Sequence, residues 1–197
     1  MGTIAPTDLT LGLIAGGRAT RLGGLDKAWL IRGGLPQVLR FARRYPGEHG
    51  PVLVSANRNA ERYAAVGLIA IADLHVDLGP LGALDALAQA CTTPWLLTLP
   101  VDLVGTNDCL IRTLVSQRDD DGAFSRDDDG PQPLVALWRT QALRGACAHA
   151  LAHDARAVHA LQARLRMREI AFAGFRFGNL NTPDDLRAAG FDPDVSA

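Results

Sequence analysis

The chain of 197 residues has little net charge, few cysteines and no long apolar run. Its formal net charge of −1 excludes the basic field that drives non-specific nucleic-acid binding. The three cysteines form no Cys-x-x-Cys pair, so neither a disulfide framework nor a zinc knuckle is indicated, and a reducing compartment is favoured. No apolar run approaches the ~20 residues that cross a bilayer, and no signal peptide is evident. These absences predict a cytoplasmic protein that binds neither nucleic acid nor membrane.

Lysine is the scarcest charged residue, because Lys27 is the only lysine among the 20 lysine and arginine residues. It lies at the end of residues 13–27, the most glycine-dense segment. An ammonium group is a compact point charge, whereas a guanidinium group is a wide planar fork. A site that reaches one phosphate oxygen through a narrow opening would therefore favour lysine. Chance in an arginine-biased composition explains a single lysine about equally well.

Short apolar runs alternate with helical patterns through the first hundred residues. Strands are expected at residues 9–15, 51–55, 68–72 and 95–99, and helices at 36–44, 60–66 and 81–90. This alternation predicts a three-layer α/β fold, with a mostly parallel sheet and helices on both faces. The length allows one sizeable core and no linker divides the chain, so residues 1–197 are expected to form a single domain.

The second half has a less regular pattern. Short strands, which can pair antiparallel, are expected at residues 122–125 and 133–138, helices at 141–152 and 157–163, a strand at 167–173 and a helix at 183–189. Thr182 and Asp185 have the spacing of a weak capping box at the last helix. A short repeat, Arg-Asp-Asp-Asp-Gly at 118–122 and 126–130, is interpreted as two solvated turns around a strand, with divalent-cation binding as the alternative.

The first strand runs into a glycine-rich loop that contains Gly16 and Gly17. In an open parallel sheet, ligands bind beyond the carboxyl ends of the strands. Backbone N–H groups of such a loop can cradle phosphates, and Arg18, Arg21 and Lys27 add positive charge. A purely structural turn would explain the glycines but not these three cations. The spacing matches neither the Walker pattern nor Gly-x-Gly-x-x-Gly.

Polar residues and glycines also follow the other three strands. Asn57 can hydrogen-bond a base or ribose, or can cap the next helix. Asp73 ends the third strand, and Gly79 and Gly82 form a second glycine loop that begins a helix. Asp102 follows the fourth strand and can hold Mg²⁺, which usually takes one or two carboxylates plus phosphate oxygens. Two acids at one sheet edge favour a metal site over structural caps.

The chain resembles the molybdenum cofactor guanylyltransferase (MobA) family from Leu11 to about Ala188. The most specific matches are Ile-Ala-Gly-Gly at 14–17, Arg-Leu-Gly-Gly at 21–24 and Asp-Lys at 26–27, with support from 56–58, 79–82, 100–102 and 179–183. The resemblance implies a Rossmann-like nucleotidyltransferase fold. It also implies an enzyme that uses GTP and Mg²⁺ to transfer GMP to the terminal phosphate of the molybdopterin cofactor and releases pyrophosphate. Cofactor-delivery proteins and acceptor molybdoenzymes are further partners that it implies.

The resemblance also assigns roles to residues. By this analogy Lys27, Arg21 and Asp102 are the catalytic residues, and Asp102 binds the metal. The nucleotide and cofactor contacts are Ile14, Ala15, Gly16, Gly17, Lys27, Asn57, Asp73, Gly79, Gly82, Asp102 and, on the pterin side, Asn181. Three features depart from the family pattern: Leu22 replaces a methionine, Leu-Val-Gly at 103–105 stands where a proline is common, and 118–130 match poorly.

Two other functions stay open. Cytidylyltransferases for the same cofactor and sugar-phosphate nucleotidyltransferases share the fold, but usually have Ala-Ala-Gly where this chain has Ala-Gly-Gly at 15–17. The Gly-Gly pair favours guanine. A non-catalytic cofactor-binding chaperone of the same fold would need no Mg²⁺, and the presence of Lys27 and Asp102 speaks against it.

Overall fold

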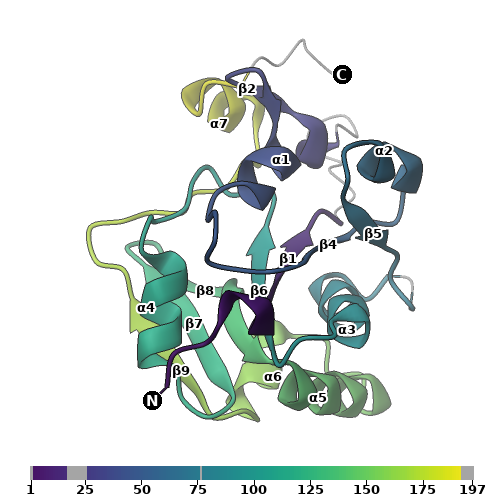
Figure 1. The fold of residues 1–197 in the computed structure, drawn as a ribbon, viewed down its shortest axis with the longest axis vertical. Helices are drawn as coiled ribbons and strands as arrows, with labels where there is room; N and C mark the ends of the chain where they lie inside the picture. Colours follow the sequence, from purple (N-terminus) through teal and green to yellow (C-terminus); the bar gives the residue numbers. More distant parts are fainter. Residues whose placement is uncertain (1, 17–25, 76, 192–197) are drawn as a thin grey trace.

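The computed structural model describes residues 2–16, 26–75 and 77–191. A sheet of seven strands lies between two layers of helices, in the order β5-β4-β1-β6-β8-β7-β9 (Figure 1). The strands are β1 (Leu9–Ile14), β4 (Val52–Ser55), β5 (Ile69–Ile71), β6 (Trp95–Pro100), β7 (Gly122–Asp127), β8 (Gly130–Arg139) and β9 (Met167–Ala171). The predicted three-layer α/β architecture is confirmed.

The first four of these strands run in one direction, so their carboxyl ends lie at one edge of the sheet. β1 pairs in parallel with both β4 and β6, and β4 pairs in parallel with β5. The chain moves outward from β1 to β5 and then returns to the other side of β1, so the strand order reverses between β1 and β6. Such a reversal point is where open α/β sheets bind ligands. Ile14 lies opposite Pro100, so the segments after β1 and β6 leave the sheet side by side.

The second half of the chain extends the sheet with a hairpin and one further strand. β8 pairs antiparallel with β6 and β7, and β9 pairs in parallel with β7. The strands expected here are confirmed, although β7 and β8 extend further, to Asp127 and from Gly130. Because the carboxyl ends of β7 and β9 lie at the same edge as that of β6, the chain after β9 can return to that edge.

The helices divide between the two faces of the sheet. Side chains from α1 (Gln37–Ala42), α2 (Ala60–Ala65) and α4 (Leu110–Gln117) belong to one buried cluster, and those from α3 (Pro80–Ala90), α5 (Thr140–Ala152) and α6 (Val158–Ala163) to the other. Near the carboxyl edge lie η3 (Lys27–Trp29), the hairpin of β2 (Ile31–Arg32) and β3 (Leu35–Pro36), and α7 (Pro183–Ala188) (Figure 1). A 3-10 turn, η1 (Pro6–Asp8), precedes β1. Sequence reasoning missed α4 and the hairpin.

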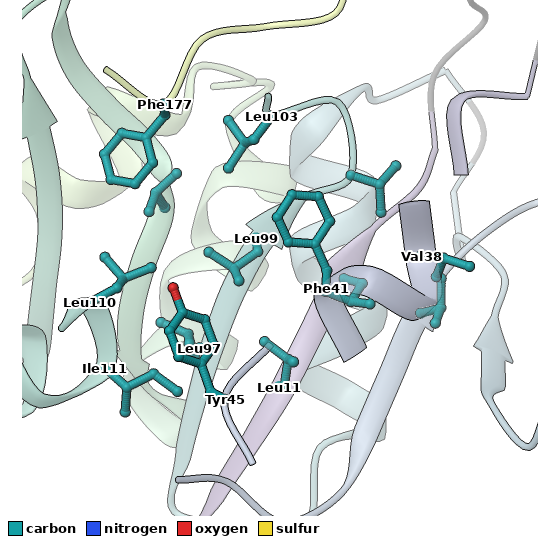
Figure 2. Packing of buried hydrophobic residues seen from close by; sticks show 14 of the residues in the cluster. Leu11, Val38, Phe41, Tyr45, Leu97, Leu99, Leu103, Leu110, Ile111 and Phe177 are labelled. Atoms are coloured by element: carbon teal, nitrogen blue, oxygen red, sulfur yellow. The ribbon is translucent and has the colours of Figure 1, made fainter. Parts of the chain in front are cut away.

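Alternation along β1 and β6 explains the two cores. Leu11, Leu97 and Leu99 face α1 and α4, and Figure 2 shows them with Phe41 and Tyr45 in that core. The intervening positions face α3, where the strand is closely covered. A Cβ atom at Gly12 would lie 2.9 Å from Leu96 Cδ1 and 3.1 Å from Leu87 Cδ1. A side chain at this point of β1 would therefore require Leu96 and Leu87 to shift, so glycine allows α3 to pack closely on the sheet. Over the part of the chain described here, none of the helices has the length and apolar character to cross a bilayer.

Candidate active site

Lys27, Asp102 and Asn181 meet at the carboxyl edge of β1 and β6. Lys27 Nζ lies 3.4 Å from Asp102 Oδ2 and donates to Asn181 Oδ1 at 3.3 Å. The Lys27 side chain is 17% exposed and that of Asp102 32%, so both are reachable from solvent. The structure thus brings together predicted residues from the beginning, middle and end of the chain. The predicted residues Gly17 and Arg21 lie outside the described residues.

A short helical turn holds Lys27 in place. The Asp26 carboxylate caps η3 by accepting from the Ala28 N–H at 3.2 Å. Trp29 is buried and its ring centroid lies 5.0 Å from that of Tyr63, while the Arg62 guanidinium lies 4.0 Å above the Trp29 ring. Burial of Trp29, two residues after Lys27, fixes the backbone of the turn that carries Lys27, while the lysine side chain keeps its rotatable bonds.

The segment that carries Asn181 is tied directly to the segment after β6. The Leu180 N–H donates to the Asp102 carbonyl at 2.7 Å, and Asn179 forms an isolated antiparallel bridge with Leu103. Thr182 and Asp185 form the predicted capping box at α7. The Asp185 carboxylate also accepts from the Asn181 N–H at 3.0 Å, and this bond, the bonds from Thr182 and the nearby Lys27 charge lower the Asp185 pKa. The backbone on both sides of Asn181 is therefore fixed.

Asp127, at the end of β7, holds the segment that leads from β9 to Asn181, because it accepts a hydrogen bond from the Phe177 backbone. Its carboxylate accepts from the Phe177 N–H at 2.8 Å, the Asp129 N–H at 3.0 Å and Gln132 Nε2 at 3.1 Å. Burial alone would raise the Asp127 pKa, but these hydrogen bonds outweigh it and the net shift is downward. Asp127 is 6% exposed, so the interpretation of its repeat as a solvated turn is wrong at this residue, because the carboxylate satisfies backbone donors.

Four of the other aspartates of the repeat form ion pairs with arginines of the same half of the chain, and Asp128 accepts from the Gly174 N–H at 3.0 Å. Asp119 pairs with Arg168 at 3.3 Å, Asp120 with Arg166 at 3.0 Å and Asp129 with Arg176 at 3.3 Å. Within residues 2–16, 26–75 and 77–191, no group of three or more His, Cys, Asp or Glu residues has a metal-binding arrangement. Divalent-cation binding by the repeat therefore receives no support.

A second polar cluster follows β4 and β5. Asn57 Nδ2 donates to Asp73 Oδ2 at 2.9 Å, and the Asp73 N–H donates back to Asn57 Oδ1 at 2.7 Å. Ser55 Oγ donates to Asp73 Oδ1 at 3.3 Å. Asn57 does not cap α2, because the N-cap position is Asn59. The two residues predicted to contact the nucleoside therefore orient each other at the predicted edge.

The glycines around this cluster differ in how closely they are packed. A Cβ atom at Gly82 would lie 3.3 Å from both Asp73 Oδ2 and the His75 carbonyl, so Gly82 lets α3 begin beside Asp73. Gly79 has φ +57°, a conformation that favours glycine at the start of the helix. At Gly16 a Cβ atom would lie 3.9 Å from Ser55 Oγ, the nearest atom among the described residues and an ordinary contact. Ile14 is buried, Ala15 half-buried and Gly16 exposed at the end of β1.

Asp102 is the described residue best suited to hold a divalent cation. It is partly exposed beside the flexible Lys27 ammonium group, and the Asn181 amide oxygen is also close to that group. Mg²⁺ needs few protein ligands when phosphates and water supply the others. One accessible carboxylate is therefore enough for this ion where phosphates and water supply its other ligands.

A family model and several curated relatives match most of the chain. Residues 12–168 match the family described as the MobA-like NTP transferase domain. A protein from Cupriavidus necator named molybdenum cofactor guanylyltransferase is 32% identical over 194 residues, covering 93% of this chain and 97% of the relative. One of the same name from Burkholderia ambifaria is 37% identical over 199 residues, covering 89% and 92%.

Solved structures share the fold. Molybdopterin-guanine dinucleotide biosynthesis protein A from Archaeoglobus fulgidus superposes with a TM-score of 0.70 at 19% identity, covering 92% of this chain and 96% of that chain. The 2-C-methyl-D-erythritol 4-phosphate cytidylyltransferase from Thermus thermophilus superposes with a TM-score of 0.65 at 17% identity, covering 91% and 96%. Because enzymes with different nucleotides in their names share this architecture, the fold alone does not select the base.

Proposed function

Because the chain belongs to the MobA-like NTP transferase family, we propose that it transfers GMP from GTP to the terminal phosphate of the molybdopterin cofactor and releases pyrophosphate. The observation that carries the proposal is the convergence of Lys27, Asp102 and Asn181 at the strand-order reversal. The relatives named guanylyltransferase cover nearly the whole chain, which supports GTP and molybdopterin as the substrates.

The proposed reaction needs charge neutralisation more than it needs a base. An oxygen of the acceptor phosphate attacks the α-phosphorus of GTP, a new P–O bond forms, and the bond to the bridging oxygen of pyrophosphate breaks. The attacking group is already anionic, so no side chain has to remove a proton. Repulsion between the phosphates and their alignment therefore dominate the barrier, and positioned cations and hydrogen-bond donors lower it.

Lys27 is suited to bind the triphosphate. Its two contacts, at 3.4 Å and 3.3 Å, are long for charge-assisted hydrogen bonds, and its side chain is partly exposed. The ammonium group can therefore rotate from Asp102 and Asn181 to a phosphate oxygen with little loss. That movement would release the Asp102 carboxylate for a cation. Asn181 then has a free amide oxygen and lies where we place the acceptor.

Asp102 would hold Mg²⁺ in this proposal. The ion, when bound, supplies charge neutralisation on the triphosphate and on the leaving pyrophosphate. The Asn57–Asp73 pair lies on the opposite side of β1, next to the end of β4, where we place the nucleoside. The cofactor-delivery proteins and acceptor molybdoenzymes implied by the family have no candidate surface in this proposal.

Pyrophosphate release tests the function directly. Purified protein with molybdopterin and Mg²⁺ should release pyrophosphate with GTP and much less with CTP or ATP. Preference for CTP would replace the guanylyl assignment with a cytidylyl one. Binding of GTP without any release in the presence of acceptor would support the non-catalytic chaperone instead.

Lys27→Arg is the sharpest single substitution. The planar fork cannot replace a point charge between Asp102, Asn181 and a phosphate, so turnover should fall at least about tenfold while the protein stays folded. Arg156→Lys is the matched control, since its exposed pair with Asp154 at 2.7 Å follows α5. Lys27→Arg turnover within about threefold of the parent, under ~1 kcal/mol, would contradict the assigned role of Lys27.

A further inference from the structure

A third hydrophobic cluster lies at the carboxyl edge and is separate from the two clusters that cover the faces of the sheet. Five buried residues and one partly buried valine form it: Leu30, Leu180, Leu186, Ala189, Phe191 and Val104. Leu30 comes shortly after Lys27, and Leu180 directly precedes Asn181. The segments that carry these two polar residues therefore share one small core.

Arg32 connects three parts of this region. Its Nη1 donates to the Val104 carbonyl at 3.0 Å, and its guanidinium carbon lies 5.7 Å from the centroid of the Phe191 ring. Arg32 itself belongs to the β2–β3 hairpin, which follows the turn that carries Lys27. Val104 lies in the loop after Asp102, and Phe191 follows α7. One half-buried side chain therefore holds the hairpin against both the loop and the end of α7.

A guanidinium group suits this position. It donates in its plane and packs through its face, so it can hold a carbonyl oxygen and an aromatic ring at once. Arg40 Nη1 donates to the Arg32 carbonyl at 3.3 Å, and Arg32 pairs with Leu35 across the hairpin, so the backbone at Arg32 is fixed as well. Among the described residues, none of the ion pairs includes Arg32. Its contacts therefore set geometry rather than neutralise a carboxylate.

The two sides of the Lys27 site are held in different ways. Asp102 and Asn181 stay together through the backbone, because the Leu180 N–H donates to the Asp102 carbonyl at 2.7 Å. Lys27 reaches the two side chains through long contacts, at 3.4 Å and 3.3 Å. Such contacts are weak, so the place of the ammonium group depends on the backbone of its own turn and on the hairpin that follows it.

We propose that Arg32 is a positioning residue, which sets the place of the Lys27 ammonium group relative to its partners Asp102 and Asn181. Gln37, directly after β3, is a second link to the same loop: its Nε2 donates to a loop carbonyl at 2.7 Å, while its Oε1 is unpaired among the described residues. Loss of Arg32 should therefore shift Lys27 without unfolding the region. The effect of Arg32 on turnover rests on the proposed function, whereas its effect on the position of Lys27 does not.

The single lysine of the chain gives a direct readout. Because Lys27 is the only lysine, lysine labelled isotopically at Cε produces one NMR signal, which reports the surroundings of the Lys27 side chain. The reference is Asn181→Ala, which removes one of the two contacts of the ammonium group. In Arg32→Met without nucleotide, the change of the Lys27 signal should be at least about half as large as in Asn181→Ala.

Arg118→Met is the matched control, because Arg118 makes the same two kinds of contact far from the site. It donates to the Gly2 carbonyl at 3.0 Å, and its guanidinium carbon lies 4.8 Å from the centroid of the Trp95 ring. Trp95 is the first residue of β6, so this contact lies at the opposite edge of the sheet from Asp102. Arg118→Met should leave the Lys27 signal at its position in the parent.

Pyrophosphate release with GTP, molybdopterin and Mg²⁺ is the second measurement. A displaced Lys27 misaligns the triphosphate, so kcat of Arg32→Met should fall at least about tenfold. KM for GTP should change less than about threefold, because the contacts that we assign to the nucleoside lie on the other side of β1. Arg32→Lys can still donate to the Val104 carbonyl and should recover kcat to within about threefold of the parent.

An unchanged Lys27 signal in Arg32→Met, or an equal change in Arg118→Met, would overturn the proposal. If Arg32→Met does not fold, Phe191→Leu removes the ring beside the guanidinium and keeps an apolar side chain; a parent-like Lys27 signal in that variant would overturn the proposal as well. If the signal changes as expected but the parent itself releases no pyrophosphate, the positioning of Lys27 by Arg32 stands and the proposed guanylyl transfer is wrong.

Discussion

Replacing Asp127 should loosen the segment that places Asn181 beside Lys27. The Asp127 carboxylate accepts three hydrogen bonds, and its partner at Phe177 N is buried. In Asp127→Ala that N–H has no acceptor, which costs about 1–3 kcal/mol, while Asp129 N and Gln132 Nε2 can turn to water at lower cost. We therefore expect a total loss of about 2–4 kcal/mol. At about 2–4 °C per kcal/mol for a chain of this size, Tm should fall by about 5–15 °C.

Chemical denaturation and activity measurements together check this prediction. Asp127→Asn, which retains one acceptor oxygen, should lose about half as much stability as Asp127→Ala. Asp129→Asn is the matched control, because its exposed pair with Arg176 should contribute less than about 1 kcal/mol. If Asn181 depends on this anchor, turnover of Asp127→Asn should fall more than its GTP affinity. A loss of stability under about 0.5 kcal/mol in Asp127→Ala would refute the reasoning.

The pH dependence of the same variants has a definite sign. The folded-state pKa of Asp127 is below its ordinary value, so the carboxylate stabilises the fold above the ordinary Asp range. That contribution is lost as pH falls through the depressed pKa. The stability difference between the parent and Asp127→Asn should therefore be full near neutral pH and should shrink on acidification. A difference that grows on acidification would contradict the cited shift.

Three other substitutions test the site. Asp102→Asn should abolish most Mg²⁺-dependent turnover with a Tm within about 2 °C of the parent, and unchanged turnover over a Mg²⁺ titration would contradict its role as the metal ligand. Gly16→Ala should not alter Tm, since among the described residues the new Cβ meets only Ser55 Oγ at 3.9 Å, but should lower the ratio of GTP to CTP turnover; an unchanged ratio would show that residue 16 does not select the base. Gly82→Ala places a Cβ 3.3 Å from Asp73 Oδ2, so GTP titration should show weaker binding by about 1 kcal/mol or more, whereas parent-like affinity would remove Asp73 from the nucleoside site.

The local sequence pattern was sufficient to predict most of the strands and helices, but it missed a few. The parallel strands were found because each is a short apolar run followed by glycine or a polar residue. The helix α4 was missed, although Leu110, Ile111 and Leu114 have helical spacing and are buried. The residues before it are polar and irregular, and the repeat after it suggested turns. The β2–β3 hairpin is only two residues long on each side, which is too short for any periodicity.

The residues of the candidate site also fall into those that the sequence predicts and those that it does not. The positions of Lys27, Asp73 and Asp102 at the carboxyl edge of the sheet could be predicted, because the order of the parallel strands indicates which segments follow their carboxyl ends. Asp127 could not, because an aspartate in an Arg-Asp-Asp-Asp-Gly repeat has no sequence signal that separates it from its exposed neighbours. Its burial and its contact with Phe177, at 2.8 Å across 50 positions of sequence, distinguish it only in the folded structure.

The sequence by itself determined the class of fold and the edge of the sheet at which the candidate site lies. Apolar periodicity and turn residues are local properties, and they dictate which segments become strands and where each strand ends. Tertiary structure alone decided that Asn181 lies 3.3 Å from Lys27, that Asn57 pairs with Asp73 rather than capping a helix, and that Gln37 keeps an unpaired oxygen. Contacts between segments far apart in the chain depend on the packing of the whole sheet. No local sequence pattern indicates which of these segments come together.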